Sequence, residues 1–225
     1  MKASVIIPAY NEETTIRDVV RGLPADFEVI VVDDGSTDNT PALAAEAGAI
    51  VVSHAGNVGY CAAIRSGLDI CTCSDVITID SDGQHDPKDA VRLLEILQTT
   101  GNSLVLGVRY RGHRRADIYD KVAERMFSLL VWLKSGRWLN DCSCGLKAFK
   151  KQLAESVRQT SPREGWHQLM CLTALKSGMG VAEVPVKAAS RTGGTSRVRV
   201  KRIRFFAKVV WQIIRYTLPE RRPSE

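Results

Sequence analysis

Apolar runs alternate with helical patterns over the first 80 residues, and this alternation constrains the fold more than any other feature. The runs are rich in Val and Ile and end in Pro, Gly or acidic residues, as buried strands of parallel sheets do. They cover residues 3–8, 27–32, 49–52 and 76–80, and the helical patterns cover 16–23, 37–47 and 62–71. This order predicts an α/β fold with a doubly wound, mostly parallel sheet and right-handed crossovers.

Further elements are predicted along the rest of the chain. Thr14 or Thr15 is expected to cap the first helix, and Asn39 or Thr40 the second. Later helices are predicted over residues 88–99, 122–133 and 164–175, and strands over 103–108 and 181–186, the last at a sheet edge. The helix at 122–133 is apolar on nearly every side, which predicts either full burial or partial seating in lipid.

Polar side chains gather where the predicted strands end. The three sets are Pro8, Tyr10 and Glu12; Asp33 and Asp34; and Asp80 and Asp82. Ligands of doubly wound sheets bind beyond the carboxyl ends of the strands, so these side chains are expected at one rim. Carboxylates gathered there repel one another unless a cation or the donors of a ligand lie among them. The sequence therefore predicts a ligand site at this rim.

The segment Asp80-Ser81-Asp82-Gly83-Gln84-His85 closes the strand at 76–80. Its two carboxylates on alternate residues and the Gln84 amide supply hard oxygen ligands, which suit Mg²⁺ or Mn²⁺. Taken alone, the segment has a second interpretation as a polar turn without a metal. No Gly-x-Gly-x-x-Gly follows the first strand, and no Gly-x-x-x-x-Gly-Lys-Ser/Thr loop occurs, so the usual dinucleotide and P-loop sites are not indicated.

Positive charge is concentrated at the C-terminal end. The formal charge is +6, and residues 187–225 hold 11 Lys and Arg against 2 Glu. One predicted helical stripe is apolar and consists of Ile203, Phe206, Ala207, Val210, Ile214 and Thr217. A basic stripe with flanking aromatic residues lies beside it, which predicts a helix in a membrane interface. The alternative is a helix docked on the core; nucleic acid is not expected as a partner, because no base-stacking module occurs.

The cysteine and hydropathy patterns indicate a cytosolic chain. None of the six cysteines forms a Cys-x-x-Cys pair, and no signal peptide precedes the first strand. We expect reduced, mostly buried thiols; a zinc site built from the two Cys-x-Cys pairs is the less typical alternative. No run of 18 apolar residues occurs, so no transmembrane helix is expected.

An ordered series of short motifs resembles a known family. The motifs are residues 5–12 (VIIPAYNE), 31–38 (VVDDGSTD), 57–59 (NVG), 80–87 (DSDGQHDP), 107–110 (GVRY), 141–149 (DCSCGLKAF) and 183–186 (EVPV), followed by Arg191. They are similar to motifs of the inverting glycosyltransferases of family 2, which have the GT-A fold. The Asp-x-Asp-Gly-Gln-His variant resembles the dolichyl- or polyprenyl-phosphate sugar transferases. We expect a GT-A domain over residues 1–197 and a basic amphipathic helix and tail over 198–225.

The resemblance implies roles for the rim residues. Those implied to contact the base and ribose of a nucleotide are Pro8, Tyr10, Glu12, Asp33, Asp34 and Ser81. Those implied to hold Mg²⁺ or Mn²⁺ against the donor diphosphate are Asp80, Asp82 and Gln84. Arg109 is implied to face a phosphate, with a surface ion pair as the alternative. A second phosphate-binding cation is expected among Arg114, Arg115 and Lys121.

Three further residues complete the predicted site. Arg191 begins a loop with two adjacent glycines, which the family closes over the donor phosphates. Asp141 is implied to orient the acceptor, or to act as a base if the acceptor is a hydroxyl. With Asp82 and Arg109 it forms the predicted catalytic set. His167 lies at a helix start, for which a structural role is the favoured interpretation and a catalytic role the alternative.

The implied reaction moves a hexose, with inversion, from a nucleotide-diphosphate sugar to a polyprenyl or dolichyl phosphate, with GDP-mannose as the favoured donor. A phosphate acceptor is ionised at pH 7 and needs no strong base. The alternatives are a family member acting on a saccharide hydroxyl, a polyprenyl-phosphate transferase using UDP-glucose, and a non-catalytic membrane-associated subunit. We expect a peripheral protein on the cytoplasmic face of a membrane; the sequence indicates no oligomeric state.

Overall fold

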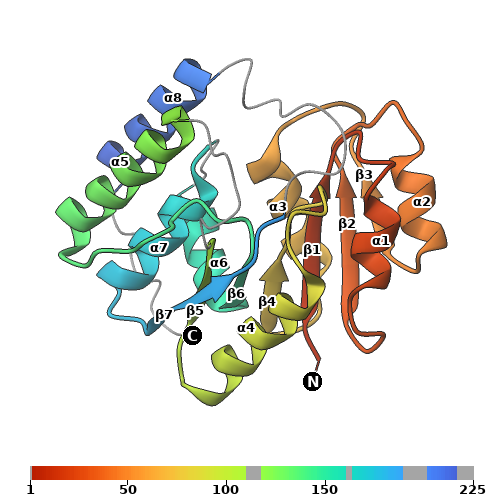
Figure 1. Cartoon of the computed structure of the whole chain (residues 1–225), viewed down its shortest axis with the longest axis horizontal. Helices are drawn as coiled ribbons and strands as arrows, with labels where there is room; N and C mark the ends of the chain where they lie inside the picture. Colours follow the sequence, from red (N-terminus) through yellow and green to blue (C-terminus); the bar gives the residue numbers. More distant parts are fainter. Residues whose placement is uncertain (1, 110–117, 161–163, 190–201, 217–225) are drawn as a thin grey trace.

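The computed structural model describes residues 2–109, 118–160, 164–189 and 202–216. Within them, seven strands form one sheet in the order β3-β2-β1-β4-β6-β5-β7 (Figure 1). The strands are β1 (Ser4–Ala9), β2 (Glu28–Asp33), β3 (Ile50–Ser53), β4 (Asp75–Thr78), β5 (Leu104–Arg109), β6 (Lys147–Lys150) and β7 (Val181–Val186). Among these strands only β6 runs antiparallel to its neighbours, which are β4 and β5. The predicted mostly parallel α/β sheet is therefore confirmed.

Helices cover both faces of the sheet (Figure 1). They are α1 (Ile16–Arg21), α2 (Thr40–Glu46), α3 (Tyr60–Ile70), α4 (Pro87–Thr99), α5 (Ile118–Ser135), α6 (Lys151–Gln159), α7 (Trp166–Lys176) and α8 (Arg202–Arg215). Successive strand residues point to opposite faces, so Ile6 packs with α3 and α5–α8, whereas Val5 and Ile7 pack with α1, α2 and α4. Burial of strand residues on both faces explains why the strands appear in the sequence as continuous apolar runs.

Two elements, β6 and α6, have no counterpart among the predicted elements. The four residues of β6 are Lys-Ala-Phe-Lys. Because a lysine stands at each end, the sequence shows no apolar run that would predict a strand here. Lys147 is nevertheless only 1% exposed, because it lies between Thr78 of β4 and Leu106 of β5. Tertiary packing thus overrides the polarity of the segment.

The predicted helix caps differ in detail from the observed ones. Thr15 is the residue before α1, but its hydroxyl makes no capping bond; it donates instead to the Ser81 carbonyl oxygen at 2.7 Å. The first turn of α2 is capped by the Asp38 carboxylate, which accepts from the Thr40 amide at 3.0 Å. The Thr15 hydroxyl therefore ties α1 to the loop that follows β4.

The C-terminal helix α8 packs on α5 and α7 through a face that differs from the predicted stripe. Val209, Ile213 and Tyr216 are buried, and the Tyr216 hydroxyl lies 2.7 Å from that of Thr173. Ile214, which the predicted stripe included, is 52% exposed. The helix is rotated relative to the prediction because the i, i+4, i+7 set at 209, 213 and 216 fills the core. The division of the chain at residue 197 stays a prediction.

Two remaining expectations concern cysteines and membrane spans. All six cysteines are free, and five of them are buried, as predicted. Among the described helices, none combines the length and apolarity needed to cross a membrane.

Candidate functional site

The loops after β1 and β2 are tied together at the carboxyl edge of the sheet. The backbone of Asn11 has φ 53°, a left-handed conformation that Asn tolerates better than most residues. Its amide donates to the Ser36 hydroxyl at 2.9 Å, and its side-chain oxygen accepts from the Thr37 amide at 2.8 Å. The Glu12 amide donates to the Thr40 hydroxyl at 2.8 Å. These bonds fix the rim segment that carries Tyr10 and Glu12.

Asp34 holds a third loop in place. Its carboxylate accepts from the Gly59 amide at 2.8 Å and the Val58 amide at 3.0 Å, and lies 2.8 Å from His54 Nδ1. Asp33 accepts from the Ser36 amide at 3.2 Å. Both aspartates are buried and engaged within the protein. Their observed role is to shape the rim, and a direct bond to a base or ribose stays a prediction.

The other residues expected to contact a nucleotide lie at the same rim. Pro8 pairs with Val32 at the end of β1, and both Pro8 and Tyr10 are half-buried. Glu12 is only 7% exposed. Ser81 is buried, and its carbonyl oxygen accepts the Thr15 hydroxyl. The structure therefore brings the segments after β1 and β4 together through Thr15.

The predicted metal ligands follow β4. The Asp82 carboxylate accepts from the Gln84 amide at 3.1 Å, which closes a tight turn between them. The Asp80 side chain is 35% exposed. Burial alone would raise its pKa, but the close contact with His85 and the charge of that ring outweigh burial and lower the pKa of Asp80 to about 2. Asp80 is therefore an ionised carboxylate that remains reachable from solvent.

Gly145 makes room for this carboxylate. A Cβ atom at position 145 would overlap the Asp80 carboxylate, and the Thr78 hydroxyl fixes the Gly145 carbonyl at 2.9 Å. The Asp-Cys-Ser-Cys-Gly turn and the loop after β4 are therefore packed directly against each other. Only glycine permits this approach.

The side chains after β4 fit a divalent cation whose coordination shell is completed by a bound ligand. Among the described residues, no group of three or more His, Cys, Asp and Glu side chains is arranged to hold a metal by itself. Mg²⁺ commonly takes one or two carboxylates and completes its shell with water and substrate phosphates. Asp80 and Asp82 supply two carboxylates of this kind within three residues of the chain, and the backbone N–H of Gln84 binds the second of them.

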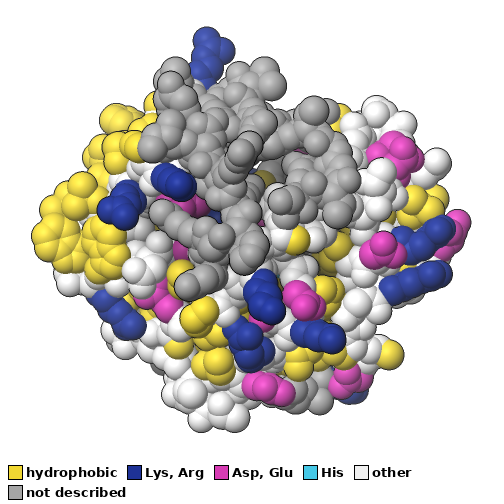
Figure 2. Space-filling view, viewed as in Figure 1, with side chains coloured by type: hydrophobic (Ala, Val, Ile, Leu, Met, Phe, Trp, Pro, Cys, Tyr) yellow, Lys and Arg dark blue, Asp and Glu magenta, His cyan; other side chains and the backbone are white. Residues whose placement is uncertain are grey.

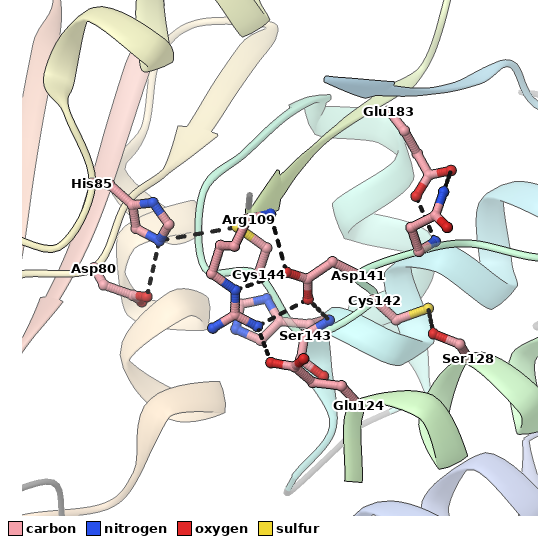
Figure 3. A network of polar contacts seen from close by, with 12 residues as sticks. Asp80, His85, Arg109, Glu124, Ser128, Asp141, Cys142, Ser143, Cys144 and Glu183 are labelled. Carbon is pink, nitrogen blue, oxygen red and sulfur yellow. Dashed lines mark hydrogen bonds and ion pairs between the residues drawn. The ribbon is translucent and has the colours of Figure 1, made fainter. Parts of the chain in front are cut away.

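His85 has an unpredicted place in the site. Its Nε2 lies 3.7 Å from an Asp80 oxygen and 4.0 Å from Cys144 Sγ (Figure 3). Burial lowers the pKa of His85, but its contacts with Asp80 and Cys144 raise it to about 10, which favours the cationic ring at pH 7. The loop is also held by the segment that follows β7, because the Ala189 amide donates to the Gln84 carbonyl oxygen at 2.8 Å.

Arg109 is engaged by two carboxylates (Figure 3). Its Nε and Nη2 lie 2.7 and 2.9 Å from the two Asp141 oxygens, and Nη2 lies 2.8 Å from Glu124 Oε1. Arg109 is thus paired within the protein by largely buried contacts, and its predicted contact with a phosphate stays a prediction. Glu124 was not predicted, since it lies on a helix that looks apolar throughout.

The Asp-Cys-Ser-Cys-Gly turn at residues 141–145, called the Asp141 turn below, is held by contacts from β5, β7 and α7 (Figure 3). The Asn140 amide donates to Glu183 on β7 at 2.6 Å. Gln168 on α7 donates to the Ser143 hydroxyl at 2.9 Å. Burial would raise the pKa of Asp141, but the bonds and charge of Arg109 lower it. Asp141 is therefore a rigidly placed, weakly basic carboxylate.

The remaining predicted cations are only partly accounted for. Lys121 lies half-buried on α5. Arg114, Arg115 and Arg191 lie outside the described residues. A buried cation that the sequence did not indicate, Lys147, lies beside the Asp141 turn, where its Nζ donates to the Cys144 carbonyl oxygen.

A doubly wound, mostly parallel sheet with the Asp80 and Asp82 carboxylates beyond its central strand is an α/β fold of the GT-A class. The chain belongs to the glycosyl transferase family 2, whose model matches residues 4–158. The resemblance and the fold class expected from the motifs are thereby confirmed.

Relatives include proteins that act on lipid phosphates. An undecaprenyl-phosphate 4-deoxy-4-formamido-L-arabinose transferase of Klebsiella pneumoniae is 28% identical over 215 residues, which are 90% of this chain and 64% of that protein. An uncharacterized protein of Methanocaldococcus jannaschii is 28% identical over 193 residues, 81% of this chain and 79% of that protein. The chain thus spans less than two thirds of the length of the Klebsiella transferase.

Solved structures of one enzyme are also similar. Glucosyl-3-phosphoglycerate synthase from Mycobacterium tuberculosis, in complex with Mn²⁺, UDP and phosphoglyceric acid, has a TM-score of 0.71 and 26% identity, covering 95% of this chain and 76% of that one. Its complex with Mg²⁺ and UDP has a TM-score of 0.70 and 25% identity, with the same coverage of both chains.

Proposed function

We propose that this glycosyltransferase moves a sugar from a nucleotide-diphosphate sugar to a polyprenyl phosphate, using Mg²⁺ or Mn²⁺ held by Asp80, Asp82 and Gln84. The observation that carries the proposal is the ionised, solvent-reachable Asp80 beyond the central strand, in space that Gly145 leaves open. The relatives acting on undecaprenyl phosphate support the acceptor. The Mn²⁺ and Mg²⁺ complexes of the mycobacterial synthase support the metal.

The residues of the rim have separate tasks in this proposal. Asp80 and Asp82 would hold the cation through their carboxylate oxygens, and His85 keeps Asp80 ionised. When bound, the cation would stabilise the negative charge on the departing diphosphate. The loops after β1 and β2, which are tied together by Asn11, present Pro8, Tyr10 and Glu12 to the nucleoside.

The state of Asp141 favours a phosphate acceptor over a hydroxyl. A hydroxyl acceptor needs a general base with a pKa near the working pH. Arg109 lowers the pKa of Asp141 and occupies both of its oxygens, which makes it a poor base. A phosphate oxygen is already anionic at pH 7 and attacks the anomeric carbon directly, as the bond to the diphosphate breaks on the opposite face.

An exposed apolar surface supports contact with the membrane that would hold such an acceptor. Figure 2 shows hydrophobic side chains gathered over α5. The exposed members on α5 and α8 are Val122, Met126, Leu129, Trp132, Leu133, Trp211 and Ile214, which are 37–64% exposed. Lys208 and Arg215 on α8 are exposed beside them, and basic groups are attracted to anionic leaflets. In this proposal the protein is peripheral, on the cytoplasmic face.

A donor and acceptor screen tests the reaction. Purified protein with Mg²⁺ or Mn²⁺ is supplied with GDP-mannose or UDP-glucose, and with undecaprenyl phosphate or a disaccharide. GDP-mannose is the donor favoured from the sequence, and the UDP complexes of the mycobacterial synthase make a UDP-sugar an equal candidate. The expected product is lipid-linked sugar. Transfer to the saccharide alone would overturn the choice of acceptor.

Vesicle sedimentation tests the membrane surface. We expect the protein to sediment with anionic phosphatidylglycerol vesicles, and a Leu129→Glu/Leu133→Glu double variant to remain in the supernatant. Ile50→Glu is the matched control, because Ile50 is 49% exposed but lies on β3 at the opposite edge of the sheet. Equal sedimentation of the double variant and the control would exclude α5 as the contact.

A further inference from the structure

Lys147 is a buried cation close to the proposed site. Its side chain is 1% exposed, and its Nζ donates to the Cys144 carbonyl oxygen. No ion pair joins Nζ to a carboxylate within the described part of the chain. A lysine buried this deeply carries a large desolvation cost, so its charge calls for an explanation beyond packing.

The second partner of Lys147 is His167. Nζ lies 3.3 Å from His167 Nδ1. An ammonium group has three donors and no acceptor, so Nδ1 must accept with its lone pair. A neutral ring that accepts at Nδ1 carries its proton on Nε2. Lys147 therefore fixes the tautomer of His167 and leaves Nε2–H as a donor.

His167 is also held in orientation. Its ring packs against that of Tyr60 in a tilted arrangement, with the centroids 4.9 Å apart and an angle of 51° between the planes. No hydrogen bond joins Nε2 to another described residue, and the side chain is partly exposed. Burial, followed by the charge of Lys147, holds the pKa of His167 well below its usual range. The charged groups around the ring are Lys147 and Arg109, which lower its pKa, and Asp80 and Asp141, which raise it.

Lys147 joins His167 to the Asp141 turn, because Nζ contacts both His167 Nδ1 and the Cys144 carbonyl oxygen. The next residue of that turn, Gly145, packs against the Asp80 carboxylate. Arg109 also lies near, but its charge is already met by Asp141 and Glu124. A phosphate that enters near this turn therefore meets the fixed N–H donor of His167, behind which the Lys147 ammonium is buried, rather than a free arginine.

We propose that His167, which Lys147 positions, donates through Nε2–H to a phosphate oxygen of a bound substrate. This assignment replaces the interpretation of His167 as structural. It rests on the proposed function, since it adds a contact to that site. The donor diphosphate and the acceptor phosphate offer the same oxygen chemistry, so the experiment must distinguish them.

The tautomer is tested by NMR on the full chain labelled with ¹⁵N-histidine. The chain has four histidines, so His167→Gln suffices to assign the signal. We expect a neutral ring with its proton on Nε2 at pH 7. In Lys147→Met, which removes the charge and keeps the volume, we expect the pKa of His167 to rise. A proton on Nδ1, or a doubly protonated ring at pH 7 in the wild type, would overturn the assignment.

Separate ligand additions then identify the contact. One sample receives UDP with Mg²⁺, one receives geranyl phosphate, and one receives inorganic phosphate. The ligand that moves the His167 Nε2 signal is the source of the contacted oxygen. His54 is the internal control, because its two ring nitrogens already lie 2.8 and 2.9 Å from Asp34 and Ser66. Binding detected elsewhere in the spectrum, with His167 unmoved, would refute the contact.

Two variants separate contact from structure. His167→Gln keeps an N–H donor near the Nε2 position and is expected to bind the identified ligand within about threefold of wild type. His167→Leu removes the donor and is expected to lose about 10- to 100-fold in affinity, as for a hydrogen bond to a charged group. Equal losses in both variants, with unchanged melting temperature, would contradict the donor role. If no ligand moves any resonance, the proposed function fails, whereas the tautomer assignment is judged separately.

Discussion

The guanidinium of Arg109 contacts both oxygens of the Asp141 carboxylate, with Nε–Oδ2 at 2.7 Å and Nη2–Oδ1 at 2.9 Å. This bidentate pair joins the end of β5 to the turn before β6. The pair also lowers the basicity of Asp141, the carboxylate that would have to act as general base for a hydroxyl acceptor. Asp141 is thus a positioning residue in the proposed mechanism, and the acceptor must bring its own negative charge.

The pair makes a prediction about stability and pH. We expect Asp141→Asn to lower the free energy of unfolding by about 2 kcal/mol at pH 7, because it leaves a largely buried Arg109 with one carboxylate partner fewer. The pKa of Asp141 is lowered in the folded state. Its contribution is therefore complete above about pH 4, the ordinary range for Asp, and is lost as the pH falls through the lower folded value.

Urea unfolding at several pH values checks this expectation. The difference between wild type and Asp141→Asn should be constant from pH 7 to about pH 5 and shrink toward pH 2. A difference that does not depend on pH would show that the charge of Asp141 contributes nothing to the pair.

The same variant distinguishes the two acceptors kinetically. With a polyprenyl phosphate, Asp141→Asn should lower kcat by no more than about tenfold, because no proton has to be removed. Loss of a general base typically costs about 10²- to 10⁴-fold. Steady-state transfer assays with saturating donor provide the measurement, and a loss in the larger range would favour the hydroxyl acceptor.

Gly145→Ala should displace Asp80. The added Cβ would overlap the Asp80 carboxylate, so one of the two segments must move. We expect at least a tenfold loss in Mg²⁺ or Mn²⁺ affinity in the presence of UDP, measured by calorimetry. Gly56→Ala is the matched control, since a Cβ there would meet nothing within 4 Å. Unchanged metal affinity in Gly145→Ala would remove Asp80 from the ligand set.

Asp34→Ala should loosen the loop at residues 56–59. The Val58 and Gly59 amides and His54 would lose their shared acceptor. A buried donor without a hydrogen-bond acceptor lowers the free energy of unfolding by about 1–3 kcal/mol, so the melting temperature should fall by several degrees. Hydrogen exchange at the Val58 and Gly59 amides should accelerate in the variant; protection equal to wild type would contradict the anchoring role.

The fold followed from the sequence wherever pattern and burial agree. Strands buried on both faces appear as apolar runs, which is why β1, β2 and β4 were predicted with small boundary errors. The strand β6 was missed because its lysines are accommodated by tertiary packing. The buried face of α8 was predicted at the wrong position around the helix. A helix with aromatic and basic residues on several sides has more than one apolar stripe.

The site was predictable only as a list of residues along the chain. The alternation of Asp80 and Asp82 after a strand predicts a metal-binding loop from sequence alone, because all of its ligands lie within one segment. The partners of Arg109 could not be predicted in this way, because Glu124 and Asp141 come from a helix and a turn that only the fold brings together. Likewise, the contact of Lys147 with His167 joins β6 to α7, and no local pattern reveals it.

The central claim is that Asp80 and Asp82 bind a nucleotide diphosphate through a divalent cation. The most direct test is calorimetric titration of UDP and of GDP into the protein, with Mg²⁺ or with a chelator, for wild type and Asp82→Asn. We predict that one nucleotide binds the wild type with Mg²⁺, and that the chelator or Asp82→Asn weakens binding at least about tenfold. Equal affinity under all of these conditions would contradict the claim.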